Sequence, residues 1–282
     1  EESWRLTPAL LDQAIMDNPN ELAILIINYP GNPDGLSYSE ENLKGLATVL
    51  RKHNVLVISD EIYGRMHHTN EHKSLAHFYP EGTIITSGLS KWCGAGGWRL
   101  GTMVLPKGME ALRDAIAGIA SETFSAVSAP IQFASIKAFD YGQEVQDYVA
   151  HSQRIMSLAG NYTYEQLLKS GLKVIKPEGG FYLFPDFSSI KEFLARKNIT
   201  SCVSLCDTLL EETGVALLPG IWFGRDPKHL SARLSFVDFD GREALNGSMA
   251  IGLDTSLDYT FLEKYCPKVI KGVTALCEWI NH

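Results

Sequence analysis

Four short apolar runs in the first half of the chain, each ended by polar or turn-forming residues, constrain the fold more than any other feature. They lie at residues 22–27, 55–58, 83–86 and 103–105. Continuous apolar runs of this length, bounded by turn signals, are typical of strands buried on both faces. The runs therefore predict four strands, and strands of this kind belong to parallel sheets.

Helical patterns lie between these strands. Ser37 and Glu40 form a capping-box pair that predicts a helix start, and apolar residues then recur at helical spacing up to Leu50. A second helical pattern lies between Met109 and Ile119. Because strand and helix alternate, we expect a three-layer α/β fold, with a mostly parallel sheet covered by helices on both faces. Ligands of such sheets bind beyond the carboxyl ends of the strands.

The second half of the chain has a different pattern. Residues 127–170 are helical, without a strand signal. Short strand signals follow at residues 174–175, 180–184, 215–218 and 229–236. In the last of them apolar and polar residues alternate, as in a strand with one buried face. We therefore predict two domains, a first at residues 1–145 and a smaller α+β domain at residues 146–282.

Composition excludes several classes of protein. The chain has 282 residues, with 25 Lys and Arg against 33 Asp and Glu, which gives a net charge of −8. An acidic chain argues against a protein whose main task is binding nucleic acid. The longest aliphatic run, residues 22–27, is far shorter than the roughly 20 residues that a membrane span needs. We therefore expect neither nucleic acid nor membrane as a partner.

The five cysteines are too few for a disulfide framework. Cys202 and Cys206 share one helix face, but no nearby His or Cys pair completes a zinc site, so we expect them in the core and predict no metal. This composition favours a reducing, cytoplasmic compartment.

The segment after the third predicted strand is rich in groups that bind anions. Lys91 follows Ser87 and Ser90 and precedes a glycine-rich run that reaches Arg99. Glycines let backbone amides approach an anion, hydroxyls donate to it, and a guanidinium is a forked donor suited to phosphate. A lysine beside such a pocket could position a phosphorylated cofactor or form a Schiff base with it. The alternative is an ordinary exposed lysine.

Polar residues also end the first two predicted strands. Asp60 follows the second strand, Tyr63 lies three residues later, and Asn32 lies in the proline-rich turn after the first. Each alone has an ordinary interpretation, because Asp is a common helix cap and Asn a common turn residue. Together they predict an acid, a phenol and an amide at the edge where the lysine and arginine also lie.

Seven segments, in order along the chain, resemble the motifs of class I/II aminotransferases, which are pyridoxal-phosphate enzymes of the aspartate aminotransferase fold. The segments are residues 28–35, 59–63, 87–91, 97–101, 177–185, 215–220 and 232–236. One such motif would be weak, whereas seven in sequence are highly specific. The resemblance implies that residues 1–145 are part of the large cofactor-binding domain, and that residues 146–282 form the small C-terminal domain.

The resemblance implies three catalytic residues and one further cofactor ligand. Lys91 is implied as the Schiff-base lysine. Asp60 would pair with the protonated pyridine nitrogen of pyridoxal 5'-phosphate, which keeps the ring able to accept electrons. Tyr63 and Asn32 would hydrogen-bond the phenolic oxygen of the ring.

It also implies the residues that bind phosphate and substrate. Ser90 and Arg99, with help from Ser87, would bind the cofactor phosphate. Gly88 occupies a position where many members carry a phosphate-binding serine, so the set of donors departs from the usual pattern. Arg233 would bind the substrate carboxylate through its two parallel N–H groups.

The implied function is transfer of an amino group from an amino acid to a 2-oxo acid, by an enzyme that is a homodimer when full length. Residues 115–135 contain no Arg or Lys. Members that act on acidic substrates resemble one another in carrying a second arginine near there, so its absence argues against an acidic side chain as the preferred substrate. Two alternatives remain open: a C–S β-lyase on the same fold, and an aminotransferase-like effector domain of a transcriptional regulator.

Full-length relatives carry about 100 to 150 residues before a segment like residues 3–8. The resemblance therefore implies that the 282 residues are a C-terminal portion of such an enzyme. The preceding part would supply the first strands of the large sheet, an aromatic that stacks on the cofactor and a phosphate-binding loop. Without it, we expect exposed sheet edges and apolar surface.

Overall fold

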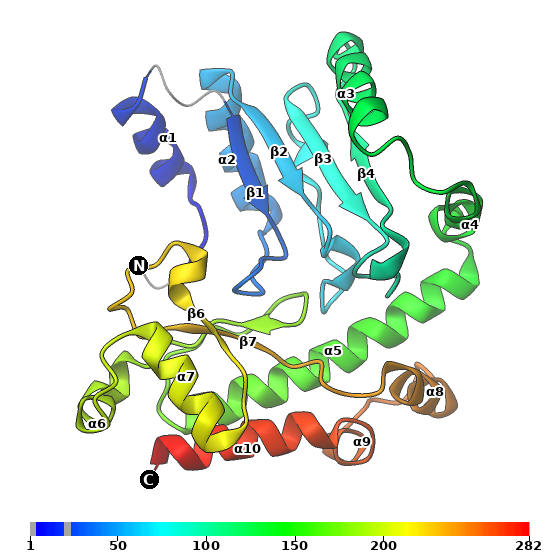
Figure 1. The fold of residues 1–282 in the computed structure, drawn as a ribbon. Helices are drawn as coiled ribbons and strands as arrows, with labels where there is room; N and C mark the ends of the chain where they lie inside the picture. Colours follow the sequence, from blue (N-terminus) through cyan, green and yellow to red (C-terminus); the bar gives the residue numbers. More distant parts are fainter. Residues whose placement is uncertain (1–3, 20–23, 282) are drawn as a thin grey trace. The chain divides into compact units, whose positions relative to one another are not determined.

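The computed structural model describes residues 4–19 and 24–281 (Figure 1). The chain divides into two compact units. The first, which we call the sheet unit, comprises Trp4–Pro30 and Ser37–Val149. The second, the C-terminal unit, contains Gly31–Leu36 together with the chain from Ala150 onward. Each unit is described by itself below.

The sheet unit contains one four-stranded sheet in the order β1-β2-β3-β4. Its strands are β1 (Ile24–Asn28), β2 (Leu56–Asp60), β3 (Thr83–Gly88) and β4 (Gly101–Val104). The first three are parallel, which confirms the mostly parallel α/β sheet, whereas β4 is antiparallel to β3. A parallel return normally needs a long crossover, usually a helix, and the short segment between β3 and β4 contains only a three-residue 3-10 turn, Gly96–Trp98. Residues 22–23 of the predicted first strand lie outside the described residues.

Helices cover one face of this sheet. They are α1 (Pro8–Asp17) and α2 (Glu40–His53), while α3 (Glu110–Thr123) and α4 (Ala129–Asp140) follow β4. The apolar stripe of α2 joins a buried core with residues of α1, β1 and β2. The predicted cap is wrong by two residues: Ser39, not Ser37, accepts a hydrogen bond from the Asn42 backbone N–H at 3.2 Å. A cap must reach the N–H two or three residues into the helix, and here the helix begins at Glu40.

The opposite face of the sheet is open at both edges. Ile26 is 71% exposed and Ile24 51%, whereas Ile27, which points to the other face, is 5% exposed. Met103 on β4 is 46% exposed. The apolar surface and the open sheet edges that the sequence predicts are therefore present in the described residues. Exposed apolar edge strands are usually paired or covered in folded proteins.

The C-terminal unit combines helices with a small antiparallel sheet, as predicted. The long helix α5 (Gln143–Lys169) leads into it, and strands β5 (Tyr182–Leu183), β6 (Leu218–Pro219) and β7 (Ala232–Ser235) pair in the order β5-β7-β6. Its other helices are α6 (Lys191–Arg196), α7 (Cys202–Thr213), α8 (Gly241–Ile251), α9 (Tyr259–Tyr265) and α10 (Pro267–Asn281).

The core of the C-terminal unit lies between α7, α10 and the small sheet. Cys202 and Cys206 are buried on α7, which confirms their predicted place in the core. The strand signal at residues 174–175 is wrong, because neither residue lies in a strand; the neighbouring Lys173 forms an isolated bridge with Asp186. None of the helices in the described ranges has both the length and the apolar composition needed to cross a membrane.

Candidate active site

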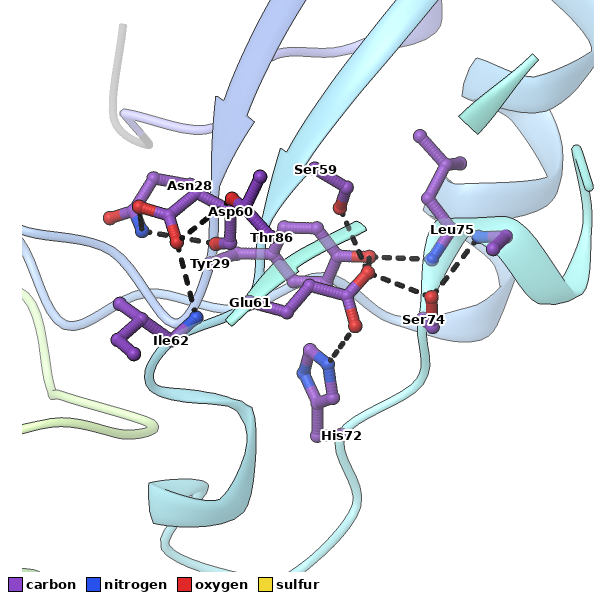
Figure 2. A network of polar contacts seen from close by, with 11 residues as sticks. Asn28, Tyr29, Ser59, Asp60, Glu61, Ile62, His72, Ser74, Leu75 and Thr86 are labelled. Atoms are coloured by element: carbon purple, nitrogen blue, oxygen red, sulfur yellow. Dashed lines mark hydrogen bonds and ion pairs between the residues drawn. The ribbon is translucent and has the colours of Figure 1, made fainter. Parts of the chain in front are cut away.

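The carboxylate of Asp60 is held at the end of β2 by groups from the two neighbouring strands and from the turn that follows β2 (Figure 2). Its Oδ2 accepts a hydrogen bond from Asn28 Nδ2 at 3.1 Å. Its Oδ1 accepts from the Ile62 backbone N–H at 3.3 Å and from Thr86 Oγ1 at 3.4 Å. Asn28 and Thr86 are the register partners of Asp60 in β1 and β3, so all three side chains lie on one face. The sheet therefore presents an oriented acid at its carboxyl edge.

Lys91 and Tyr63 lie together in the sheet unit. Tyr63 is buried and precedes a short 3-10 turn, Gly64–Met66. The Lys91 Nζ is 5.8 Å from the centre of the Tyr63 ring, within the range of a cation–π contact. The structure thus brings the predicted amine and phenol into one place.

The loop that carries Lys91 is closed by backbone hydrogen bonds. Gly94 N–H donates to Lys91 O at 3.0 Å, and Ala95 N–H donates to Leu89 O at 3.1 Å. Leu89 N–H donates in turn to Leu100 O at 3.2 Å, which extends the β3–β4 pairing. These bonds fix the backbone of Lys91, so that the position of the amine depends on its side chain alone.

Gly88 has a steric reason to be glycine. A Cβ at this position would lie 2.5 Å from the carbonyl oxygen of Leu100, because the antiparallel β4 passes directly beside it. A serine cannot occupy this place without moving the β3–β4 backbone. The departure from the usual motif, noted in the sequence, therefore follows from the close approach of these two strands.

The two serines before Lys91 occupy different environments. Ser87 lies in β3, and because Thr86 pairs with Asp60, alternation points Ser87 to the opposite face of the sheet. Ser90 lies beyond the end of the strand, half-buried and next to Lys91. Thr86 donates directly to Asp60, a contact that the sequence does not reveal.

Arg99 is exposed and sits in a left-handed backbone conformation, with φ of 54°. Its Nη1 donates to the carbonyl oxygen of Gly96 at 2.9 Å, which holds the guanidinium against its own turn. Within the residues that the structure describes, the other donors of the guanidinium are available to an anion.

The C-terminal unit brings together the other two predicted residues, Asn32 and Arg233. Arg233 Nη1 donates to Asn32 Oδ1 at 2.8 Å. The guanidinium lies over the rings of Tyr182, at 4.4 Å, and Phe223, at 5.1 Å. Stacking on aromatic faces leaves the planar fork of an arginine fixed in direction, as recognition of a carboxylate requires.

The turn that carries Asn32 is anchored within the C-terminal unit through Gly35. The carbonyl oxygen of Gly35 accepts from the backbone N–H groups of Glu178 at 2.8 Å and Gly179 at 3.0 Å. Gly35 has a φ of 70°, and a Cβ there would lie 2.6 Å from the carbonyl oxygen of Tyr182. Only glycine allows this approach, which explains how the Asn32 turn reaches the Arg233 strand.

Glu61, which the sequence analysis did not select, is the centre of a buried polar network (Figure 2). Its carboxylate accepts from Ser59 Oγ at 2.9 Å, Ser74 Oγ at 2.7 Å and His72 Nε2 at 3.0 Å. Burial acts to raise the pKa of Glu61, but the hydrogen bond and charge of His72, together with the two serine hydroxyls, outweigh it and lower the pKa below its ordinary value. The polar cluster at residues 59–61 was visible in the sequence, whereas the contribution of His72 was not.

A sequence profile described as "Aminotransferase class I and II" matches residues 1–239. This chain belongs to that family. The chain is 36% identical over 220 residues to the probable N-acetyl-LL-diaminopimelate aminotransferase of Bacillus subtilis, covering 78% of this chain and 52% of that protein. It is also 36% identical over 228 residues to the aspartate aminotransferase of Geobacillus stearothermophilus, covering 78% of this chain and 54% of that protein.

Solved structures agree on the fold of this chain. Aspartate aminotransferase from Thermus thermophilus with maleate gives a TM-score of 0.72 at 28% identity, covering 87% of this chain and 59% of that one. Aromatic aminotransferase from Pyrococcus horikoshii gives a TM-score of 0.72 at 25% identity, covering 94% of this chain and 65% of that one. The predicted family and fold are confirmed. The chain spans about half the length of the curated relatives it matches.

Proposed function

We propose that the protein carrying this chain transfers an amino group from an amino acid to a 2-oxo acid with pyridoxal 5'-phosphate as cofactor. The observation that carries the proposal is the position of the Lys91 amine 5.8 Å from the Tyr63 ring. Asp60, in the same unit, is held at the carboxyl edge of the sheet by hydrogen bonds from three other residues. Membership of the aminotransferase family supports the same reaction class.

The residues of the sheet unit fit this cofactor by their chemistry. Lys91 offers a primary amine that can bind an aldehyde covalently. Asp60 offers an oriented carboxylate for a pyridinium N–H. Arg99 and Ser90 offer donors for the phosphate, and the exposed guanidinium of Arg99 donates one hydrogen bond to Gly96 within the described part of the chain.

When bound, the cofactor supplies an electron sink for the pair left at the substrate Cα after loss of its proton. Asp60 would stabilise the positive charge at the ring nitrogen. The hydroxyl of Tyr63 would donate a hydrogen bond to the ring oxygen. Lys91 Nζ would take the proton from the substrate Cα, and its fixed backbone would keep the amine within reach of that carbon.

Arg233 would hold the carboxylate of the amino acid substrate. Its guanidinium has five N–H donors, and one of them is used by Asn32. The rings of Tyr182 and Phe223 restrict the side chain, so the substrate carboxylate would be bound in one orientation. We further propose that the complete enzyme is a cytoplasmic homodimer, and that its preferred substrate lacks an acidic side chain.

Borohydride reduction of the complete protein, after loading with pyridoxal 5'-phosphate, tests this function. We expect a stable label on Lys91, found by peptide mass mapping, and no label in Lys91→Ala. An amino-donor panel then separates transfer from elimination. Transfer converts the added 2-oxo acid into its amino acid, whereas a β-lyase releases pyruvate and ammonia. A label on Lys91→Ala equal to that of the wild type would contradict the assignment.

A further inference from the structure

Two carboxylates follow one another at the end of β2 and point to opposite faces of the sheet. The ladder continues through this point, since Tyr29 N–H donates to Asp60 O at 3.3 Å and Glu61 N–H donates to Thr86 O at 2.9 Å. In an extended chain, successive side chains alternate between faces. Only one of the two acids can therefore lie on the face where Asn28 and Thr86 contact Asp60.

Each face has its own set of partners. Asn28 in β1 donates to Asp60 at 3.1 Å, and the next residue, Tyr29, donates its hydroxyl to Glu61 at 3.4 Å. Figure 2 shows the two groups, with Asn28 and Ile62 at Asp60 and with Ser59, Ser74 and His72 at Glu61. The partners are thus divided in the same way at the ends of both strands, where Asn28 is followed by Tyr29 and Asp60 by Glu61.

The Glu61 site is buried and joins segments far apart in the sequence. The side chains of Glu61 and His72 are 8% and 15% exposed. Tyr29 is fully buried, and its hydroxyl also accepts from the Leu75 N–H at 2.7 Å. Burial and the neighbouring Glu61 raise the pKa of Tyr29, so the phenol stays protonated and acts as a donor to Glu61. Four donors surround the buried Glu61 carboxylate and hold it in a single position.

We propose that Glu61 is a positioning residue for Asp60. Its four donors, from Tyr29, Ser59, His72 and Ser74, fix the end of β2 so that Asp60, and not Glu61, points to the cofactor face. A shift of one residue in the register would exchange the two acids, and would bury Asp60 among hydroxyls while leaving the longer Glu61 beside Asn28. This inference rests on the proposed function, because it assigns Asp60 to the cofactor.

The mechanism depends on geometry and involves no chemical step at Glu61. Removing the carboxylate leaves buried donors without their acceptor, and these groups gain by moving toward water or other acceptors. Such movement shifts the backbone at residues 59–61, because Ser59 and Glu61 flank Asp60 on either side. Asp60 then loses the orientation in which its carboxylate accepts the hydrogen bond from Asn28.

Three variants of the complete protein test the proposal: Glu61→Ala, the conservative Glu61→Gln, and Leu46→Ala as the matched control. Leu46 is fully buried in α2, so its truncation lowers stability while leaving every hydroxyl and imidazole donor of Glu61 in the chain. Crystal structures without cofactor show the position of the Asp60 carboxylate. We expect it to leave Asn28 and Thr86 in Glu61→Ala, and to keep both contacts in Glu61→Gln and Leu46→Ala.

Kinetics of the loaded enzyme provide the second readout. We expect kcat of Glu61→Ala to fall about 10- to 100-fold, the loss seen when a residue that orients a metal ligand is removed. Glu61→Gln should recover most of this loss. KM for the amino acid should change less than about 3-fold, because Arg233 is unaffected. If Glu61→Ala does not fold, Ser74→Ala, which removes a single donor, is measured in the same way.

Two results would overturn the proposal: an unchanged Asp60 carboxylate in Glu61→Ala or Ser74→Ala, or a kcat no lower than that of Leu46→Ala. The structural readout needs no cofactor, so it is independent of the proposed function. A wild-type protein that takes no label on Lys91 would instead refute the assignment of the reaction, whatever the Asp60 side chain does.

Discussion

Arg233 Nη1 donates a hydrogen bond of 2.8 Å to the side-chain oxygen of Asn32, a residue 201 positions earlier in the chain. The contact lies within the C-terminal unit, because the turn from Gly31 to Leu36 belongs to that unit. The same guanidinium lies over Tyr182. Arg233 is therefore fixed by both an amide and an aromatic ring, and the role proposed for it in substrate binding can be tested separately from cofactor chemistry.

Arg233→Lys should raise KM for the amino acid about 10- to 100-fold, because an ammonium cannot form the bidentate contact or stack on Tyr182 in the same way. The cofactor should still label Lys91 after borohydride reduction. Steady-state kinetics with a good donor measure the change, and Arg242→Ala, at an exposed position of α8, is the control. An unchanged KM would show that Arg233 does not bind the substrate carboxylate.

Asp60→Asn should reduce kcat by at least about 100-fold, the cost of removing one electrostatic group aimed at a developing charge. The amide keeps the size of the side chain but cannot provide the negative charge that a protonated pyridine nitrogen requires. Cofactor affinity should fall much less, since Lys91 and Arg99 remain. Single-turnover rates and a cofactor titration distinguish the two effects, and activity close to that of the wild type would refute the role of Asp60.

Gly88→Ala should destabilise the protein by about 1–3 kcal/mol, because the added methyl group meets a backbone atom and cannot be relieved by a side-chain rotation. The contact is with Leu100 O, at 2.5 Å from the position of the new Cβ. Gly97→Ala is the matched control, since nothing lies within 4 Å of its Cβ position. Urea unfolding measures both variants, and equal losses would contradict the steric explanation.

Glu61 should make the free energy of unfolding decrease at acidic pH. Its pKa in the folded protein lies below the ordinary value of 4.5. The unfolded chain therefore takes up the proton at a higher pH than the folded one, so the contribution is present above about pH 4.5 and is lost as the pH falls through the folded pKa. The difference in unfolding free energy between wild type and Glu61→Gln should shrink over this interval. A difference that stays constant or grows toward low pH would contradict the sign.

The parts of the fold that depend on local pattern were predictable. Short apolar runs identified the strands, and the polar residues at their ends identified Asp60 and Lys91, because carboxyl ends of parallel strands share one edge. The direction of β4 was not predictable, since it depends on whether the chain crosses the sheet or returns along it. The helix start at Glu40 was misjudged because Ser37 and Ser39 are both acceptable caps by composition.

The features that the sequence does not predict depend on contacts between segments that lie far apart in the chain. The bond from Arg233 to Asn32 requires the close approach at Gly35, which no periodicity reveals. Glu61 is adjacent to Asp60 in the sequence, but its buried hydrogen-bond network depends on His72 and Ser74. These two residues lie in an irregular loop, where no regular spacing predicts their contacts. A sequence pattern shows which side chains share a face, and does not show which of two adjacent acids receives the buried donors.

The two exposed isoleucines of β1 have a practical consequence for work with this polypeptide by itself. An uncovered strand bearing Ile24 and Ile26 is a template onto which another molecule's strand can add, so self-association should increase steeply with protein concentration. A lysine placed at Ile26 would oppose such stacking by charge repulsion while leaving the helix-covered face untouched. Aggregation of the isolated polypeptide would then reflect this bare strand edge, and would say nothing against the chemistry at Lys91.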